Sequence, residues 1–397
     1  MTTTSRNPEL LRARTCRLLQ FYWPDIVDRR FGGYVAQLDE RDGHVYDGRS
    51  KHLVATCRAI HNFAIGVAID GPTYCRAAAE HGLHFLRHVQ WDEEDEGYDW
   101  LLSGRETADD TRHCYGHAFA VLATARAVEV GLPDANAELE RALGVLDERF
   151  FEPEYGLYAD AASGDWSAYH QYRGQNANMH ACEALLAAYE ATGDEAHLDR
   201  AATVAASLVR DRADEAGRVW EHYTTEWEPD LAYNRDEPDH LFRPWGYQPG
   251  HHAEWAKLLC HLAEHRDDAW LVPRAKELFD TAVAIGWDEN HGGFHYTVDE
   301  SGEPVVADKY GWALAEGIGA AARLAVHDET YLEWYDRLQG CATDHVVNPR
   351  FGNWYERLSH DWSWDGPNHG TAVEPGYHPV ANQHVAMDVF EEHDELR

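Results

Sequence analysis

Short segments that combine glycine with aromatic residues recur six times along the 397-residue chain, and this repeat constrains the fold more than any other feature. The segments begin at positions 30, 95, 154, 216, 291 and 350 and read RFGGYVAQLD, DEGYDWLLS, EYGLYADA, AGRVWEHY, HGGFHYTVDE and RFGNWYERL. Each alternates aromatic and polar residues beside a glycine, which is typical of a short strand or hairpin. Their spacing of roughly 60–75 residues indicates a repeat architecture.

Pairs of Ala- and Leu-rich stretches with helical spacing lie between these segments, as in ANMHACEALLAAYEAT followed by EAHLDRAATVAASLVRD. Between those two stretches, Gly193 can close one helix and Asp194 can cap the next. About twelve helices in six pairs predict an all-α (α/α)6 barrel with short β-hairpins between the pairs, because a closed ring needs no capping repeats. We expect one domain over residues 1–397; the alternative is a set of unrelated helical bundles.

The first helix after each hairpin should form the inner layer of the ring, and these stretches carry the unusual polar residues. Several lie near expected helix N-termini, which the topology gathers at one mouth. A cleft lined with Trp, Tyr, His, Arg and Glu suits a polyhydroxylated ligand, because rings stack on its apolar faces and polar groups bind its hydroxyls. The residues in question are Arg58, Tyr115, His117, Asn176, His180, His251, Glu254, Trp312, Glu316 and His378.

The charge balance restricts the partners. Acidic residues outnumber basic ones by 70 to 34, the net charge is −36, and the only lysines are Lys51, Lys257, Lys276 and Lys309. A globular chain with so acidic and lysine-poor a composition suggests adaptation to high salt, where screening over about 3 Å at 1 M weakens like-charge repulsion. A nucleic acid or an anionic membrane would be repelled, so neither is expected as a partner.

The seven cysteines are dispersed and form no CxxC pair, which is typical of a reduced, intracellular protein. The first 25 residues lack the apolar core of a signal peptide, and no apolar run approaches the ~18–20 residues of a membrane span. These features predict a soluble, cytoplasmic protein. The oligomeric state stays open, with a homo-oligomer allowed.

The stretch RPWGYQPGHHAEW, residues 243–255, raises the question of a metal site. It contains no HExxH pattern, and the pair His113 and His117 lacks a third ligand nearby in the sequence. We therefore expect neither a metal nor another cofactor. The chain also has no GxSxG nucleophile motif, no phosphate-binding glycine loop and no recognisable catalytic cysteine signature.

Two kinds of acid–base chemistry remain. Glu254 and Glu316 could form the carboxylate pair of a glycoside hydrolase. Alternatively, His251 could transfer protons near neutral pH, with Glu254 three residues later on the same helical face to orient the imidazole. From its position alone, His251 is either such a residue or a capping or packing residue.

The motif RPWGYQPGHHAEWAKLL resembles the N-acylglucosamine 2-epimerase superfamily, in particular its branch of sugar aldose–ketose isomerases, and the resemblance extends over essentially the whole chain. Supporting matches are CRAIHNFA, HCYGHAF, NANMHACEALLAAYEATGD, GGFHYTVDESG, YGWALAEG and the late GYH. The family fold, an (α/α)6 barrel, agrees with the repeat.

The resemblance also implies site residues. The catalytic histidines correspond to His251 and His378, the glutamate that supports the first corresponds to Glu254, and Arg58 corresponds to the arginine beside the reacting oxygens. Many members carry Lys or Gln where this chain has Glu374, which leaves the recognition of an anionic substrate group in doubt. The sugar contacts correspond to Tyr115, Asn176, His180, Arg243, Trp245, Trp312 and Glu316.

The implied reaction is a cofactor-independent interconversion of an aldose and its ketose, with mannose and fructose as the first pair to test. His378 would move a proton from C2 to C1 through an enediolate, Arg58 would stabilise the enediolate, and His251 would handle protons on oxygen. A sugar 2-epimerase of the N-acylglucosamine or cellobiose type and a sulfoquinovose isomerase are the alternatives. An (α/α)6 glycoside hydrolase and a non-enzymatic interaction protein are the less favoured alternatives.

Overall fold

Twelve α-helices form the framework of the computed structural model, which describes residues 5–35, 37–240, 242–364 and 374–397. Four of the helices, α3, α5, α7 and α11, continue into one turn of π-helix. The helices are α1 (Pro8–Tyr22), α2 (Leu53–Ala68), α3 (Tyr74–Phe85), α4 (Cys114–Glu129), α5 (Ala135–Val145), α6 (Gln175–Thr192), α7 (Glu195–Ala205), α8 (Pro249–His265), α9 (Leu271–Gly286), α10 (Gly311–Ala325), α11 (Tyr331–Cys341) and α12 (Tyr377–Glu392).

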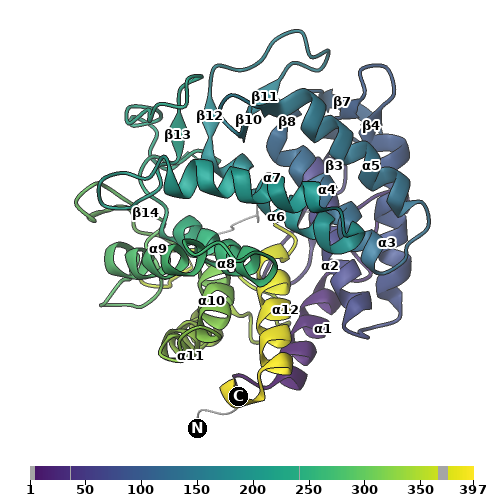
Figure 1. The fold of residues 1–397 in the computed structure, drawn as a ribbon. Helices are drawn as coiled ribbons and strands as arrows, with labels where there is room; N and C mark the ends of the chain where they lie inside the picture. Colours follow the sequence, from purple (N-terminus) through teal and green to yellow (C-terminus); the bar gives the residue numbers. More distant parts are fainter. Residues whose placement is uncertain (1–4, 36, 241, 365–373) are drawn as a thin grey trace.

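The helices form an inner and an outer layer. α2, α4, α6, α8, α10 and α12 are buried on nearly all sides, whereas the other six bury one face only. Each inner helix packs on the next inner helix and on one outer helix, and α12 packs on both α2 and α1. Figure 1 shows the last helix, α12, beside the first, α1, which closes the ring. The predicted all-α (α/α)6 barrel is confirmed.

Local sequence signals set several helix ends. Gly193 adopts φ +71° after α6, a left-handed conformation that glycine tolerates without strain, and Asp194 caps α7 by accepting from the backbone N–H of Ala196. Both roles agree with the prediction for this turn. Asn7 caps α1 in the same way, with Pro8 in its first turn.

Short strands of two to four residues connect the helices. They are β1 (Gln37–Leu38), β2 (Val45–Asp47), β3 (Ser50–His52), β4 (Trp91–Asp92), β5 (Gly97–Tyr98), β6 (Leu101–Ser103), β7 (Glu106–Asp109), β8 (Arg112–His113), β9 (Phe151–Glu152), β10 (Leu157–Tyr158), β11 (Ala161–Ala162), β12 (Arg173–Gly174), β13 (His222–Tyr223), β14 (Thr297–Val298), β15 (Pro304–Val306), β16 (Lys309–Tyr310) and β17 (Arg357–Leu358). Each glycine–aromatic segment found in the sequence contains at least one strand.

Four of the nine strand pairs among the described residues are not local hairpins. β3 pairs with β6, β8 with β11, β12 with β13 and β16 with β17, and each of these pairs joins the segment before an inner helix to the segment after the following outer helix. We call such a pair a clasp, because it ties the two ends of a helix pair together. Each clasp also brings a backbone carbonyl to the first N–H of the inner helix, at Leu53 with Trp100, Cys114 with Asp160, Gln175 with Glu221 and Gly311 with Glu356.

One continuous apolar core fills the space between the two helix layers. All seven cysteines are free thiols, as the dispersed spacing predicts, and five of them are fully buried. Among the described residues, none of the helices combines the length and the apolar character that a bilayer span requires.

Candidate active site

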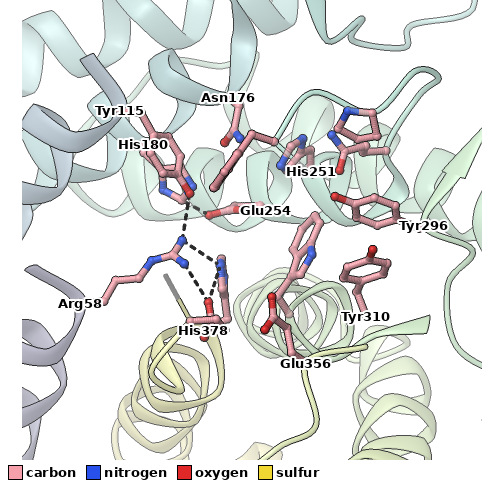
Figure 2. Close-up of a pocket in the computed structure, with 15 residues that line it drawn as sticks. Arg58, Tyr115, Asn176, His180, His251, Glu254, Tyr296, Tyr310, Glu356 and His378 are labelled. Carbon is pink, nitrogen blue, oxygen red and sulfur yellow. Dashed lines mark hydrogen bonds and ion pairs between the residues drawn. The ribbon is translucent and has the colours of Figure 1, made fainter. Parts of the chain in front are cut away.

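The first turns of five inner helices present one side chain each to the mouth of the ring. Each of these residues is the second or third of its helix, and together they form an upper tier around a cavity of about 80 Å³. The upper tier comprises Tyr115 on α4, Asn176 on α6, His251 on α8, Trp312 on α10 and His378 on α12. The expected convergence of polar residues at one mouth is therefore present (Figure 2).

A lower tier lies one helical turn deeper, at the sixth residue of each inner helix. Arg58, His180 and Glu254 belong to it and form part of the cavity wall. Glu316 on α10 and Asn382 on α12 occupy the same level but are buried behind the wall. The regular spacing explains why residues from five helices meet, since equivalent positions of a ring repeat face the same axis.

His378 is held on both ring nitrogens. Its Nδ1 lies 2.7 Å from Oε1 of Glu316, and its Nε2 lies 3.3 Å from Nη2 of Arg58. Because Lys257 and Asn382 both donate to the Glu316 carboxylate, that carboxylate accepts from Nδ1–H and leaves the Nε2 lone pair on the side of Arg58 and the cavity. Burial, and then the positive charge of Arg58, hold the pKa of His378 well below its ordinary value, so the ring is a neutral base.

Arg58 connects three groups of the cavity wall. Nη1 donates to Oε2 of Glu374 at 2.8 Å, and Nη2 donates to the hydroxyl of Tyr115 at 3.0 Å (Figure 2). The guanidinium also lies 4.5 Å above the ring of Phe119, which fixes its plane. Burial raises the pKa of Glu374 to about 7, although Arg58 opposes this effect. The arrangement offers a fixed pair of donors beside His378.

His251 is oriented by a residue that the sequence did not indicate. Its Nδ1 lies 2.9 Å from Oε2 of Glu221, which approaches from the clasp of α6 and α7. Gln175 donates to the same carboxylate oxygen at 2.8 Å, and Trp255 donates to the side-chain oxygen of Gln175. The amide nitrogen of Gln175 lies 2.8 Å from the same Nδ1. Because the Glu221 carboxylate can only accept, we assign the ring proton to Nδ1, which leaves Nε2 available to a ligand.

Glu254 is not the partner of His251 that was predicted. Neither of its carboxylate oxygens has a hydrogen-bond partner among the described residues, and its nearest ionic neighbour is Nδ1 of His180 at 3.8 Å. Three-residue spacing places both side chains on one face of α8, but Glu254 lies a turn deeper while Glu221 reaches His251 from outside the helix. Burial and the nearby Glu316 raise the pKa of Glu254 well above its ordinary value, which favours the protonated form of this carboxyl group at the cavity wall.

Trp312 separates the two histidines. Its ring centroid lies 5.1 Å from that of His251 and 5.6 Å from that of His378. A Cβ added to Gly250 would lie 2.6 Å from the Trp312 ring, which explains the glycine that precedes His251. Asn176 completes the upper tier, and its side-chain oxygen is buried without a donor among the described residues. These groups offer one stacking face and one free acceptor to a sugar.

Three other predicted contacts lie elsewhere. Glu316 does not line the cavity, because it is fully buried between His378, Lys257 and Asn382. Arg243 lies in a neighbouring cavity, where it is paired with Asp160. Trp245 lies in neither cavity; its indole N–H donates to the backbone of Leu231, and its ring packs on Trp220. The motif RPWGYQPGH thus brings only its final histidine, with Pro244 and Gln248, to the first cavity.

Two of the residues that sequence reasoning missed share a position. Glu221, which orients His251, and Glu356, which lines the cavity, both stand four residues after the glycine of their segments. Asp160 occupies the same place in a third segment. An acidic residue at one fixed offset in a repeat is a signal that could have identified them, because the clasp places that residue beside the start of an inner helix.

The lower tier also contains groups that could hold a metal ion. Glu254, Glu316 and His378 have ligand atoms within 4.8 Å of one another, and so do His180, Glu183 and Glu254. The ammonium of Lys257 lies 2.5 Å from Glu316 and 3.8 Å from Glu183, and therefore already provides a positive charge at the place a cation would take. Chemistry without a metal or cofactor stays a prediction.

Comparison with known proteins gives consistent similarities. The sequence profile of the N-acylglucosamine 2-epimerase family matches residues 32–380. A D-mannose isomerase from Marinomonas mediterranea is 41% identical over 374 residues, which cover 93% of this chain and 94% of that protein. A D-mannose isomerase from Thermobifida fusca is 36% identical over 362 residues, which cover 87% and 88% respectively.

A solved crystal structure of a D-mannose isomerase has the same architecture. It superimposes with a TM-score of 0.93 at 39% sequence identity and covers 96% of this chain and 98% of that one. The similarity therefore extends over nearly the whole fold.

Proposed function

Since this chain belongs to the N-acylglucosamine 2-epimerase family and is an aldose–ketose isomerase, we propose that its substrate is a neutral free hexose, D-mannose first, which it converts to D-fructose. The observation that carries this proposal is the pairing of two preorganised histidines on either side of Trp312, with Arg58 beside one of them. Arg58, the one arginine or lysine among the described residues that line the cavity, is already paired with Glu374, and Glu356 lines the same wall. This charge balance disfavours an anionic sugar such as sulfoquinovose.

In the proposed mechanism, His378 is the carbon base. After the sugar ring opens, the Nε2 lone pair of His378 removes the proton from C2, which is acidic because it lies next to the C1 aldehyde. The enediolate that results places negative charge on its oxygens, where Arg58 can donate and lower the barrier. His378 then returns the proton to C1, and the product is the ketose. Glu316 compensates the imidazolium that exists between these two steps.

The reaction also requires a proton transfer between the oxygen atoms on C2 and C1. Isomerisation also moves a proton from the hydroxyl on C2 to the oxygen on C1. We assign this transfer to His251 through its Nε2, with Glu254, whose protonated form burial favours, as a donor to an enediolate oxygen. Tyr115, Asn176, His180 and Trp312 hold the sugar. No step requires a cofactor or a second substrate.

The direct test is incubation of the purified protein with D-mannose in deuterated buffer and analysis of the product by NMR. Fructose formation supports the proposal. Formation of glucose alone would identify a 2-epimerase, in which a proton leaves one face of C2 and returns to the other. Cleavage of mannosides without isomerisation would identify a hydrolase, and inertness toward all sugars would favour an interaction protein.

Exchange of Glu221 for glutamine tests the support of His251. The variant keeps the side-chain shape but removes the charged acceptor of Nδ1–H. A hydrogen bond to a charged group is worth roughly 1.5–3 kcal/mol. We therefore expect kcat to fall by about 10- to 100-fold. Glu221→Asp should recover part of the loss. Glu226→Gln, at an exposed position of the same loop, is the matched control. Unchanged kcat in Glu221→Gln would mean that His251 needs no such support.

The pH dependence of kcat/KM follows from the state of His378. The base is active when neutral, and burial with Arg58 holds its pKa well below 6.5, so protonation stops the reaction only at lower pH. We expect the acid limb of the profile to lie below pH 6.5. The profile should also be recorded in Glu374→Gln, because the Glu374 pKa of about 7 can add a limb of its own. An acid limb at or above pH 6.5 in that variant would contradict the assignment.

We further propose that the protein works in the cytoplasm at high salt concentration. The net charge of −36 and the seven free thiols support this setting. Raising KCl from 0.1 M to 1 M shortens the screening length from about 10 Å to about 3 Å, which weakens repulsion within the folded acidic surface. The melting temperature should therefore rise over this range. A constant or falling melting temperature would argue against high-salt adaptation.

A further inference from the structure

The inner helices begin at the mouth of the ring, so their C-terminal ends meet at the opposite face, which we call the far face. Helix C-termini carry partial negative charge, which a cation stabilises. α4 and α10 each have an arginine in the last turn, Arg126 and Arg323, whereas α6 has no basic residue there and α8 has only His265. α6 and α8 also pack on each other less than any other two neighbouring inner helices do. The joint between α6 and α8 therefore has neither a cation of its own nor extensive packing.

Three side chains that can ligate a metal meet at this joint. His261 and His265 are four residues apart at the end of α8, which places them on one face of the helix. Glu190 stands in the last turn of α6, and its Oε1 lies 2.6 Å from Nε2 of His261 and 3.7 Å from Nε2 of His265. Tetrahedral zinc with bonds of about 2.0–2.1 Å needs neighbouring ligand atoms about 3.3 Å apart. The two distances lie on either side of this value, so small side-chain rotations suffice.

Two of the three groups are in the protonation state that a metal requires. Burial, and then the charge of Arg323, hold the pKa of His261 below its ordinary value, so the ring is neutral at pH 7. Burial raises the pKa of Glu190, but its contacts with His261 and Arg126 outweigh this effect and hold that pKa below its ordinary value, so the carboxylate is ionised. A metal therefore does not have to displace a bound proton from either group.

The arginines near this cluster have carboxylates of their own. Arg126 donates to both oxygens of Glu129, at 2.7 and 2.9 Å. It reaches Glu190 at Oε2, at 3.2 Å, rather than at Oε1, which faces the two histidines. Arg323 is paired with Glu264. The three carboxylates outnumber the two arginines, so the local charge balance favours a further cation.

We propose that His261, His265 and Glu190 bind one zinc ion, which joins α6 to α8 at the far face of the ring. Two imidazole nitrogens and one carboxylate oxygen form a ligand set typical of Zn²⁺, whereas Mg²⁺ and Ca²⁺ prefer oxygen ligands. The side chains of His265 and Glu190 are each 26% exposed, so solvent zinc has a path to the site and water can take the fourth position. The metal replaces the hydrogen bond between His261 and Glu190, and the ring proton of His261 moves from Nε2 to Nδ1.

The proposed role of this zinc is structural and does not depend on the isomerase function, because the reaction at the mouth uses none of the three ligands. Glu264, the residue between the histidines that could otherwise activate a bound water, is paired with Arg323. The sequence predicted no metal, because Glu190 stands 71 residues before His261 and spacing alone does not bring them together. The site thus adds a cross-link to the least packed joint of the inner layer.

The test uses the full chain without a histidine tag, freed of metal by a chelator and then dialysed. Calorimetric titration with ZnCl₂ should show a site with a Kd below about 10 µM, and MgCl₂ should show none. Co²⁺ should occupy the same site with the visible absorption of a tetrahedral complex and be displaced by Zn²⁺. With zinc at about a hundredfold excess over Kd, the melting temperature should rise by about 3 °C. Binding of zinc weaker than about 10 µM would overturn the proposal.

Two variants locate the metal. His265→Gln and Glu190→Gln each remove one ligand, and zinc affinity should fall at least about tenfold while the rise in melting temperature disappears. His88→Gln is the matched control, because His84 and His88 have the same four-residue spacing, with ring centroids 4.6 Å apart, but belong to no three-ligand group among the described residues. Wild-type zinc affinity in His265→Gln, or a loss confined to His88→Gln, would contradict the assignment.

Two readouts keep the result interpretable. Circular dichroism without zinc identifies a variant that fails to fold; if Glu190→Gln does so because Arg126 loses a partner, His265→Gln still decides, since His265 is the exposed last residue of α8. Zinc binding by a protein that does not convert mannose would leave this inference intact. Mannose conversion without zinc binding would overturn this inference and leave the proposed function intact.

Discussion

Replacement of His378 by alanine is expected to lower kcat for the conversion of D-mannose by about 10²–10⁴-fold, the range that a positioned general base contributes. Nε2 of His378 is the neutral base nearest to Arg58, and Glu316 holds the opposite ring nitrogen. The variant should also stop the incorporation of solvent deuterium into substrate and product. Steady-state kinetics and NMR of the sugars in deuterated buffer measure the two effects.

His384→Ala is the matched control for this result. His384 stands on the same helix, further from the mouth, and contacts Asp388 at 3.1 Å. Its loss should leave kcat within about twofold of the wild-type value. If His378→Ala kept full activity and full deuterium exchange, His378 could not be the carbon base, and His251 would be the next residue to examine.

Replacement of Lys257 by methionine should lower the free energy of unfolding by about 3–5 kcal/mol, the cost of removing one partner from a buried ion pair. The Lys257 ammonium is buried with Glu316 at 2.5 Å and Glu183 at 3.8 Å. Burial alone lowers the pKa of Lys257, but these carboxylates raise it above the ordinary value, so the residue is charged in the folded protein. Methionine fills a similar volume and leaves the carboxylates without their cation.

The control for this change is Lys276→Met. Lys276 pairs with Asp328 at 3.0 Å on the surface, where both side chains are about a third exposed, and a pair of this kind contributes about 0–1 kcal/mol. Denaturation by urea, followed by tryptophan fluorescence, compares the two variants under one set of conditions. Equal shifts of the two urea midpoints would show that the buried ion pairs of Lys257 stabilise the protein no more than a surface pair does. Loss of activity in Lys257→Met beyond its loss of stability would indicate that Glu316 must be ionised to support His378.

The ring could be predicted from the sequence because its repeat is visible in residue types. Glycine–aromatic segments and the turn at Gly193 and Asp194 are local signals, and the structure places strands and helix ends at them. The two tiers of the site follow from the same regularity, since helices that start in register present equivalent positions to one axis. Convergence of Arg58, His251 and His378 is therefore a consequence of topology.

The partners of the site residues could not be predicted in the same way. Spacing along α8 favours Glu254 as the partner of His251. The actual partner is Glu221, which belongs to another repeat and lies 30 residues away in sequence, so its contact with Nδ1 of His251 depends on the tertiary structure. The role of Glu316 behind His378 likewise depends on a contact across 62 residues. Trp245 was predicted to contact the sugar because it lies in the most specific motif. In the structure it packs on Trp220, outside the site.

The packing of α1 against α12 has a consequence for the order in which the enzyme becomes active during its synthesis. A ribosome releases Arg58, Tyr115 and His251 long before it releases His378, which stands on the last inner helix. Until then α1 lacks α12, the helix on which it mainly packs, and the Glu316 carboxylate lacks His378 and Asn382. The nascent chain thus carries most of the proposed sugar-binding groups without the proposed carbon base, and α12 adds both closure of the ring and that base in one event.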